Sequence, residues 1–108
     1  MASDIKMPTL LRLCHQYKLA LMAQGISATS YPLNQASPTT DQALAHASHM
    51  ITKIEKFITL IDLLPPQETL TMLEKLNRWL GFVQCVFWTT GQYTVDELRE
   101  HIINLYQE

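Results

Sequence analysis

The chain has 108 residues, of which 47% are hydrophobic and only 17% charged, and its formal net charge is -2 at pH 7. This length predicts a single domain, residues 1–108, with one modest core. The few Lys and Arg residues form no cluster, which argues against general nucleic-acid binding. We find no secretory signal, no run long enough to cross a membrane and too few cysteines for a disulfide framework. A cytoplasmic protein without membrane association is therefore expected.

The first expected helix runs from about Pro8 to Gln24, and Gly25 suits its end. Its apolar residues recur at spacings of three and four, as on one buried face of a helix: Leu10, Leu13, Cys14, Tyr17 and Leu21. The loop that follows, about 25–38, is long and rich in Ser, Ala, Thr and Pro. Such a loop is either functional or a mobile connector, and its length favours the connector.

The second helix is expected to begin at Thr39, because Thr39 and Gln42 have the spacing of a capping box. Apolar residues follow in steps of three and four: Leu44, Ala47, Ile51, Ile54, Ile58 and Ile61. This helix must end by Leu64, because Pro65 disfavours helical geometry in the residue before it. A seam of this kind packs well against an antiparallel neighbour in a helical bundle.

The third helix is expected from Pro66 or Gln67 to Gly91, with a seam of Leu73, Leu76, Leu80, Val83 and Phe87. The fourth begins at Thr94, with Glu97 at the capping-box position, and its expected buried stripe is Val95, Leu98, Ile102 and Leu105. No strand pattern or internal repeat is present. The chain is therefore expected to be all-α, a four-helix antiparallel bundle with the apolar third helix at its centre.

The third helix is apolar nearly all round from Trp79 to Trp88. Four helices can cover a central helix only partly, so we expect a homo-oligomer, first of all a dimer, with this helix at or near the interface. Gly81 predicts close approach of another helix or of a ligand, and the thiol of Cys85 is expected to be buried and inert. The amide of Gln84 needs a partner, which is either inside its own domain, the favoured alternative, or across a symmetric interface.

His46 and His49 are three residues apart and share a side of the second helix. No third ligand stands at metal-binding spacing, so a polar contact or an interface edge is favoured over a metal site. The sequence offers no cofactor motif, no glycine-rich phosphate loop and no nucleophile with a paired base. We therefore expect no catalytic residues, no metal, no cofactor and no enzymatic activity.

The segment RWLGFVQCVFW is followed by TTGQYTVDELREH. Together they resemble a family of small proteins of tailed bacteriophages and prophages, with the pattern R-W-L-G-F-x-Q-G-x-x-W, a spacer ending in Gly, Tyr-Thr or Tyr-Ser, and an acidic D-E-[LM]-[RK]-[DE] run. The matching residues are Arg78, Trp79, Leu80, Gly81, Phe82, Gln84, Trp88, Gly91, Tyr93, Thr94, Asp96, Glu97, Leu98 and Arg99. The upstream segment ALAHASHMITKIEKF resembles the family loosely, so that about half of the chain is covered.

Two departures from the family pattern stand out. Cys85 replaces the usual Gly, which loosens any close contact at that position, and the chain continues from Ile102 to Glu108, beyond where many relatives end. The resemblance implies a phage origin and a setting of host takeover or defence inhibition inside an infected bacterium. It implies no mechanism.

Three functions are therefore considered. The least favoured is an enzyme that acts on nucleotides, because the sequence offers no metal ligands and no paired carboxylates for it. The other two are binding functions. The first is an accessory protein that binds and modulates a host or defence protein. The alternative is an oligomeric sponge that sequesters a small nucleotide signal, with Arg78 pairing with phosphate and Trp79 stacking on a base. The candidate binding residues are Arg78, Trp79, Gln84, Trp88, Arg99, His46 and His49.

Overall fold

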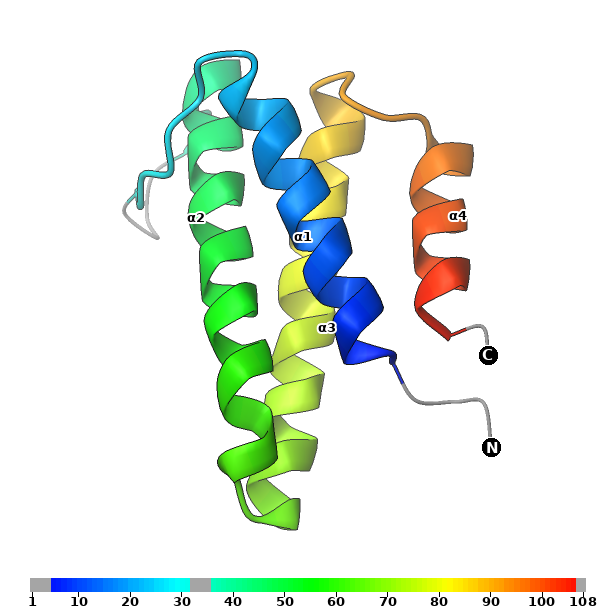
Figure 1. Ribbon diagram of the computed structural model, residues 1–108. Coiled ribbons are helices and arrows are strands. Elements are labelled where there is room, and N and C mark those ends of the chain that lie inside the picture. The colour runs from blue at the N-terminus through cyan, green and yellow to red at the C-terminus, as the bar shows by residue number, and fades with distance from the viewer. Residues whose placement is uncertain (1–4, 32–35, 107–108) are drawn as a thin grey trace.

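The computed structural model describes residues 5–31 and 36–106, and in these ranges the protein is all-α. Its elements are α1 (Met7–Met22), α2 (Thr40–Leu60), the short 3-10 helix η1 (Ile61–Leu63), α3 (Pro66–Thr89) and α4 (Val95–Tyr106). Consecutive α-helices run in opposite directions (Figure 1). The predicted four-helix antiparallel bundle is confirmed.

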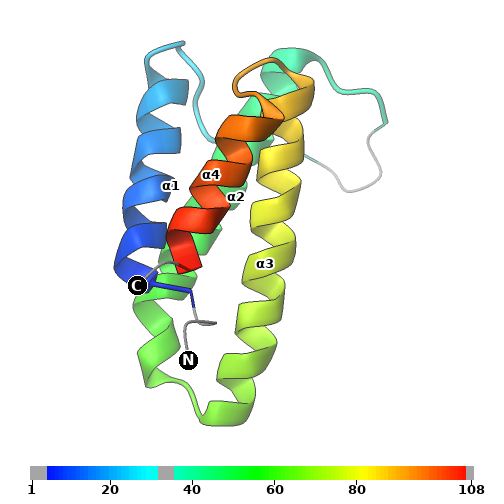
Figure 2. The same ribbon diagram turned by 90° about the vertical axis from the view of Figure 1, so that its right-hand side faces the viewer.

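The helices surround one shared core. α2 packs against both α1 and α3, and α4 completes the arrangement by contacting α1 and α3. Figure 2 shows α4 in front of α2, between α1 and α3. Packing is most extensive between α2 and α3, whereas α3 and α4 touch over a shorter length. This difference leaves part of α3 uncovered on the side of α4.

Both capping boxes form as predicted. The Gln42 N–H donates to Thr39 Oγ1 at 3.1 Å, and the Thr39 N–H donates to Gln42 Oε1 at 3.0 Å. Thr94 and Glu97 make the same reciprocal pair, at 3.1 and 2.9 Å. Each box satisfies two backbone donors that a helix start otherwise leaves unpaired. The beginnings of α2 and α4 are thus fixed by local sequence.

The core follows the predicted seams closely. All members of the first two seams are buried, and so are Leu76, Leu80, Val83 and Phe87 of α3. In α4, Leu98 and Leu105 are buried and Ile102 is partly buried. The prediction for Val95 was wrong, because its side chain is 53% exposed. Val95 is the first residue of α4 and has too little of α3 beside it to be covered.

The two cysteines lie in opposite environments. Cys14 is a core residue, and burial, with a smaller contribution from Glu55, raises the pKa of its thiol to about 12. The prediction that Cys85 is buried was wrong, because its side chain is exposed. Helical geometry gives the reason: Cys85 lies on the face of α3 opposite to Val83 and Phe87, which point into the core.

The loop after α1 is partly tied to α2. The first helix ends two residues earlier than expected, at Met22, and Gly25 then adopts a φ of 79°. The Thr29 N–H donates to the Ala45 carbonyl at 3.1 Å, and the Tyr31 N–H donates to His46 Nδ1 at 3.2 Å. The described part of this loop is therefore docked rather than a free connector. Residues 32–35, which belong to the same predicted mobile segment, lie outside the described ranges.

None of the helices described here combines the length and apolar character needed to traverse a lipid bilayer.

Candidate binding groove between α3 and α4

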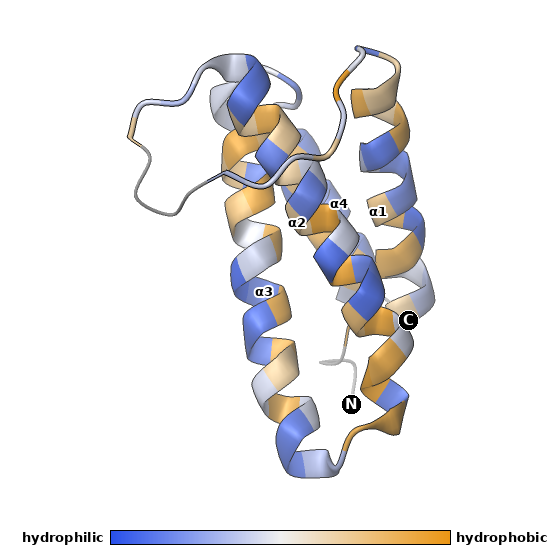
Figure 3. Ribbon diagram, turned by 90° about the vertical axis from the view of Figure 1, so that its left-hand side faces the viewer, coloured by the Kyte–Doolittle hydropathy of each residue, from blue (hydrophilic) through white to orange (hydrophobic). Residues whose placement is uncertain are grey.

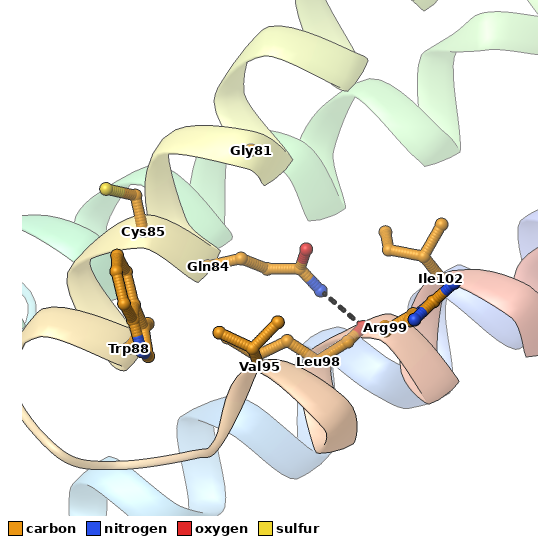
Figure 4. A pocket seen from close by; sticks show the side chains of 8 residues that line it. All are labelled: Gly81, Gln84, Cys85, Trp88, Val95, Leu98, Arg99 and Ile102. Carbon is orange, nitrogen blue, oxygen red and sulfur yellow. Dashed lines mark hydrogen bonds between the residues drawn. The ribbon is translucent and has the colours of Figure 1, made fainter.

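An open groove runs between α3 and α4, with a volume of about 460 Å³. Its lining comes from both helices: Gly81, Gln84, Cys85, Trp88, Val95, Leu98, Arg99 and Ile102 (Figure 4). Arg99 is the one charged residue in this lining. The Trp88 side chain is 54% exposed, as much as Val95 opposite it. The groove therefore presents an apolar surface to solvent.

The groove exists because α3 is apolar on two faces but is covered on one. Its inward face carries the buried seam that ends at Phe87, while Gly81, Cys85 and Trp88 recur at spacings of four and three on the outward face. The segment 79–94 contains no charged residue. Figure 3 shows the contrast: hydrophilic residues gather in the first half of α3, and the second half is mostly pale or hydrophobic.

Gly81 forms an indentation in this outward face. A Cβ atom built at this position would meet no heavy atom within 4 Å. Among residues 5–31 and 36–106, no other helix makes the predicted close approach, and Gly81 instead opens onto the groove. The helix loses about 1 kcal/mol relative to alanine at such a position. No contact within the chain explains why glycine stands there.

Gln84 closes the inner side of the groove through a partly buried polar network. Its Nε2 donates to the Tyr17 hydroxyl at 3.2 Å and to the Leu98 carbonyl at 3.4 Å, the bond drawn in Figure 4. The Tyr17 hydroxyl lies 2.8 Å from His101 Nδ1. The network thus joins α1, α3 and α4, and it supports the favoured interpretation that the Gln84 amide is satisfied inside its own domain.

The Tyr17 hydroxyl accepts from Gln84 and shares a second hydrogen bond with His101 Nδ1, in which the donor depends on the imidazole tautomer. Burial raises the pKa of Tyr17 and lowers that of His101, with Glu97 partly opposing the change at His101. Both shifts favour the neutral forms of the two side chains.

Sequence reasoning missed this network. Tyr17 was assigned to the apolar seam of the first helix, and His101 was left without a role. The two residues are 84 positions apart, so no local spacing connects them. The available signal was weaker: a tyrosine hydroxyl and a lone amide, each predicted to be buried, must both find partners.

Arg78 and Trp79 do not take part in the groove. Arg78 is exposed, and the ring of Trp79 stacks on Phe57 with centroids 4.7 Å apart and planes inclined by 19°. Lys53 Nζ lies 4.6 Å from the centroid of the same Trp79 ring. The ring expected to stack on a nucleotide base is therefore already engaged within the α2–α3 interface. This arrangement does not favour the nucleotide-sponge alternative.

His46 and His49 also lie apart from the groove. Their ring centroids are 5.9 Å apart, and Phe82 meets the His46 ring edge-on at the same distance. His46 Nδ1 accepts the Tyr31 N–H, so its contact is a polar one, as favoured from the sequence. Burial lowers the pKa of His46, with smaller effects from His49 and Lys53. Within residues 5–31 and 36–106, no three His, Cys, Asp or Glu side chains cluster as a metal site.

We expect the free energy of unfolding to fall as the pH is lowered from about 7.5 to about 5.5. Both His46 and His101 have a pKa in the folded protein below the ordinary value of 6.5, so the unfolded chain binds more protons in this interval. Stability contributed by the neutral imidazoles is present above pH 6.5 and is lost as the pH falls through the folded pKa values. Urea unfolding across this interval measures the change.

The matched variant is the double substitution His46→Asn and His101→Asn. The Asn side-chain amide stands where Nδ1 makes its hydrogen bond in the wild type, but it does not titrate. The double variant should therefore lose less stability on acidification than the wild type. An equal loss in both proteins would contradict the assignment.

The structure thus brings together three of the predicted site residues, Gln84, Trp88 and Arg99, and places the other four elsewhere. Four further lining residues, Cys85, Val95, Leu98 and Ile102, were predicted to be buried and not to form a site. Comparison of the chain with protein-family models, with curated proteins and with solved structures finds no match. The candidate binding site is therefore assigned from the lining residues and the geometry of the groove.

Proposed function

We propose that this protein is a non-enzymatic accessory protein that binds a partner protein through the groove between α3 and α4. The observation that carries the proposal is the apolar lining of the groove, with Trp88 54% exposed and Arg99 beside it. Trp and Arg are the residue types most often found as energetic anchors of protein interfaces. In line with the phage resemblance, the proposed partner is a host or defence protein of an infected bacterium.

The chemistry around the groove supports binding rather than catalysis. The polar group that reaches its inner side, the Gln84 amide, is committed to hydrogen bonds with Tyr17 and Leu98. Tyr17 and His101 are held in their neutral forms behind it. What remains available to a partner is an apolar surface, a single guanidinium group and the exposed Cys85 thiol. Such a surface can bury a complementary apolar side chain and orient an acidic one.

The proposal is tested with an affinity-tagged chain carrying Trp88→Glu, compared with the wild type in a bacterial lysate. Each bacterial protein retained by the wild type is purified and titrated against both baits. We expect at least one such protein to bind the wild type directly and to bind Trp88→Glu about tenfold or more weakly, because the substitution places a charge in the apolar contact.

The control is Leu63→Glu. Leu63 is 78% exposed on η1, at the other end of the bundle, so it adds the same charge far from the groove. This variant should bind the identified protein as the wild type does. Equal weakening by both variants, or a retained protein indifferent to Trp88→Glu, would count against the groove as the binding surface.

A further inference from the structure

We propose that a second copy of this chain covers the outward face of α3 in an antiparallel two-fold pair, with Trp88 of each copy seated over Gly81 of the other. The inference concerns the groove face of the proposed function, so a second copy and the proposed partner compete for Trp88. The stripe is formed by Gly81, Cys85 and Trp88, which are all exposed and lie on one side of the helix. It is called the α3 stripe below.

The spacing of the α3 stripe makes it complementary to itself. Gly81 and Trp88 are seven residues apart, or about 10 Å along the helix axis. Their midpoint falls between Gln84 and Cys85. A two-fold axis through this midpoint, perpendicular to α3, therefore carries each Trp88 onto the position of the other copy's Gly81.

Gly81 supplies the space that Trp88 needs. Nothing lies within 4 Å of a Cβ atom built on Gly81, so a ring can approach the backbone there. Glycine in a helix interior is costly, and close approach of another group is the usual reason for it. In the part of the chain that the structure describes, no group makes that approach. In the proposed pair, the Trp88 side chain of each copy fills the indentation at Gly81 of the other copy.

The net charges at the two ends of the α3 stripe favour an antiparallel pair over a parallel one. The segment 79–94 is uncharged, while the exposed Arg78 stands just before it and the exposed acidic residues Asp96 and Glu97 stand just after it. An antiparallel pair brings the Arg78 end of one copy to the acidic end of the other. A parallel pair would set like charges side by side and would stack Trp88 on its own copy, leaving the space at Gly81 empty.

The experiment measures the mass of the full chain in solution, together with Gly81→Leu and Trp88→Ala. We expect the wild type to show twice the chain mass of 12.4 kDa at high concentration and to dissociate on dilution. Each substitution should weaken association about tenfold or more, because it fills the indentation or removes the side chain seated in it. The monomer itself tolerates both changes, since neither position is covered within the chain.

Cysteine cross-linking tests whether the α3 stripe lies at the interface between the two copies. Cys85 lies beside the proposed axis and is exposed, whereas Cys14 is buried. A short bis-maleimide should therefore join two wild-type chains through Cys85, and Cys85→Ser should abolish the product.

Leu63→Ala serves as the control variant in the measurement of mass, since Leu63 is exposed far from the α3 stripe.

A monomeric wild type at high concentration would overturn the inference. So would a dimer that is indifferent to Gly81→Leu and Trp88→Ala, or one that gives no Cys85 cross-link. The two proposals fail separately. A monomer whose partner binding depends on Trp88 overturns the pair alone, and a dimer broken by Gly81→Leu without any Trp88-dependent partner overturns the proposed function alone.

Discussion

Phe87→Ala is expected to lower the free energy of unfolding by about 3–5 kcal/mol, whereas the neighbouring Trp88→Ala should change that of the monomer by less than about 1 kcal/mol. Phe87 is 1% exposed and its ring meets Tyr17 edge-on, with centroids 4.7 Å apart. Its removal leaves a cavity in the centre of the core. Trp88, one residue later, lies on the outward face of α3 and is largely uncovered within the chain.

Urea unfolding measured by circular dichroism provides the comparison, at a protein concentration low enough for monomers to dominate. The concentration matters because any association would add its own stabilisation to the wild type. Adjacent aromatic residues of one helix make a matched pair, since both substitutions truncate a large ring to the same methyl group. Similar losses for the two variants would show that Trp88 is part of the core and that the groove is not open.

Tyr17→Phe is expected to lower the free energy of unfolding by about 1–3 kcal/mol, although it removes a single oxygen atom. The Tyr17 hydroxyl accepts from Gln84 at 3.2 Å and pairs with His101 Nδ1 at 2.8 Å. Without it, His101 Nδ1 loses this partner and the Gln84 amide keeps a single partner, the Leu98 carbonyl at 3.4 Å. The cost arises because Tyr17 is buried and its two partners are partly buried, so that water replaces the lost hydrogen bonds only in part.

Tyr93→Phe is the control for this prediction. The Tyr93 ring belongs to the same aromatic cluster, 5.5 Å from the ring of Tyr17, but its hydroxyl makes no hydrogen bond within residues 5–31 and 36–106. Removing that hydroxyl should change the free energy of unfolding by less than about 0.5 kcal/mol. If Tyr17→Phe were as mild as Tyr93→Phe, the network would not hold α4 in place as argued.

Local sequence signals predicted the helices well for a physical reason. The seams of α1 and α2 are buried as expected, because a spacing of three and four residues puts side chains on one helical face wherever the helix packs. The starts of α2 and α4 were equally predictable from the sequence, because a capping box involves only four consecutive residues. Neither signal requires knowledge of the neighbouring helices.

The sequence did not show which of the apolar side chains beyond the core seams are exposed. Cys85 and Val95 were predicted to be buried, yet both line the groove. Burial of an apolar side chain is favourable, but whether a neighbouring helix buries it depends on how far the two helices overlap. Here α4 contacts α3 over a short length, so an apolar side chain at its first residue stays in solvent.

The sequence by itself determined the secondary structure, the inward faces and the antiparallel order of this protein, because helical periodicity, capping and short connections act over a few residues. Only the tertiary structure decided that Tyr17, Gln84 and His101 share one hydrogen-bond network and that Trp79 packs on Phe57 while Trp88 stays exposed. These outcomes depend on the lengths and relative positions of whole helices. Whether two residues far apart in the chain are in contact then depends on shifts of less than one helical turn. Local sequence spacing does not specify such shifts.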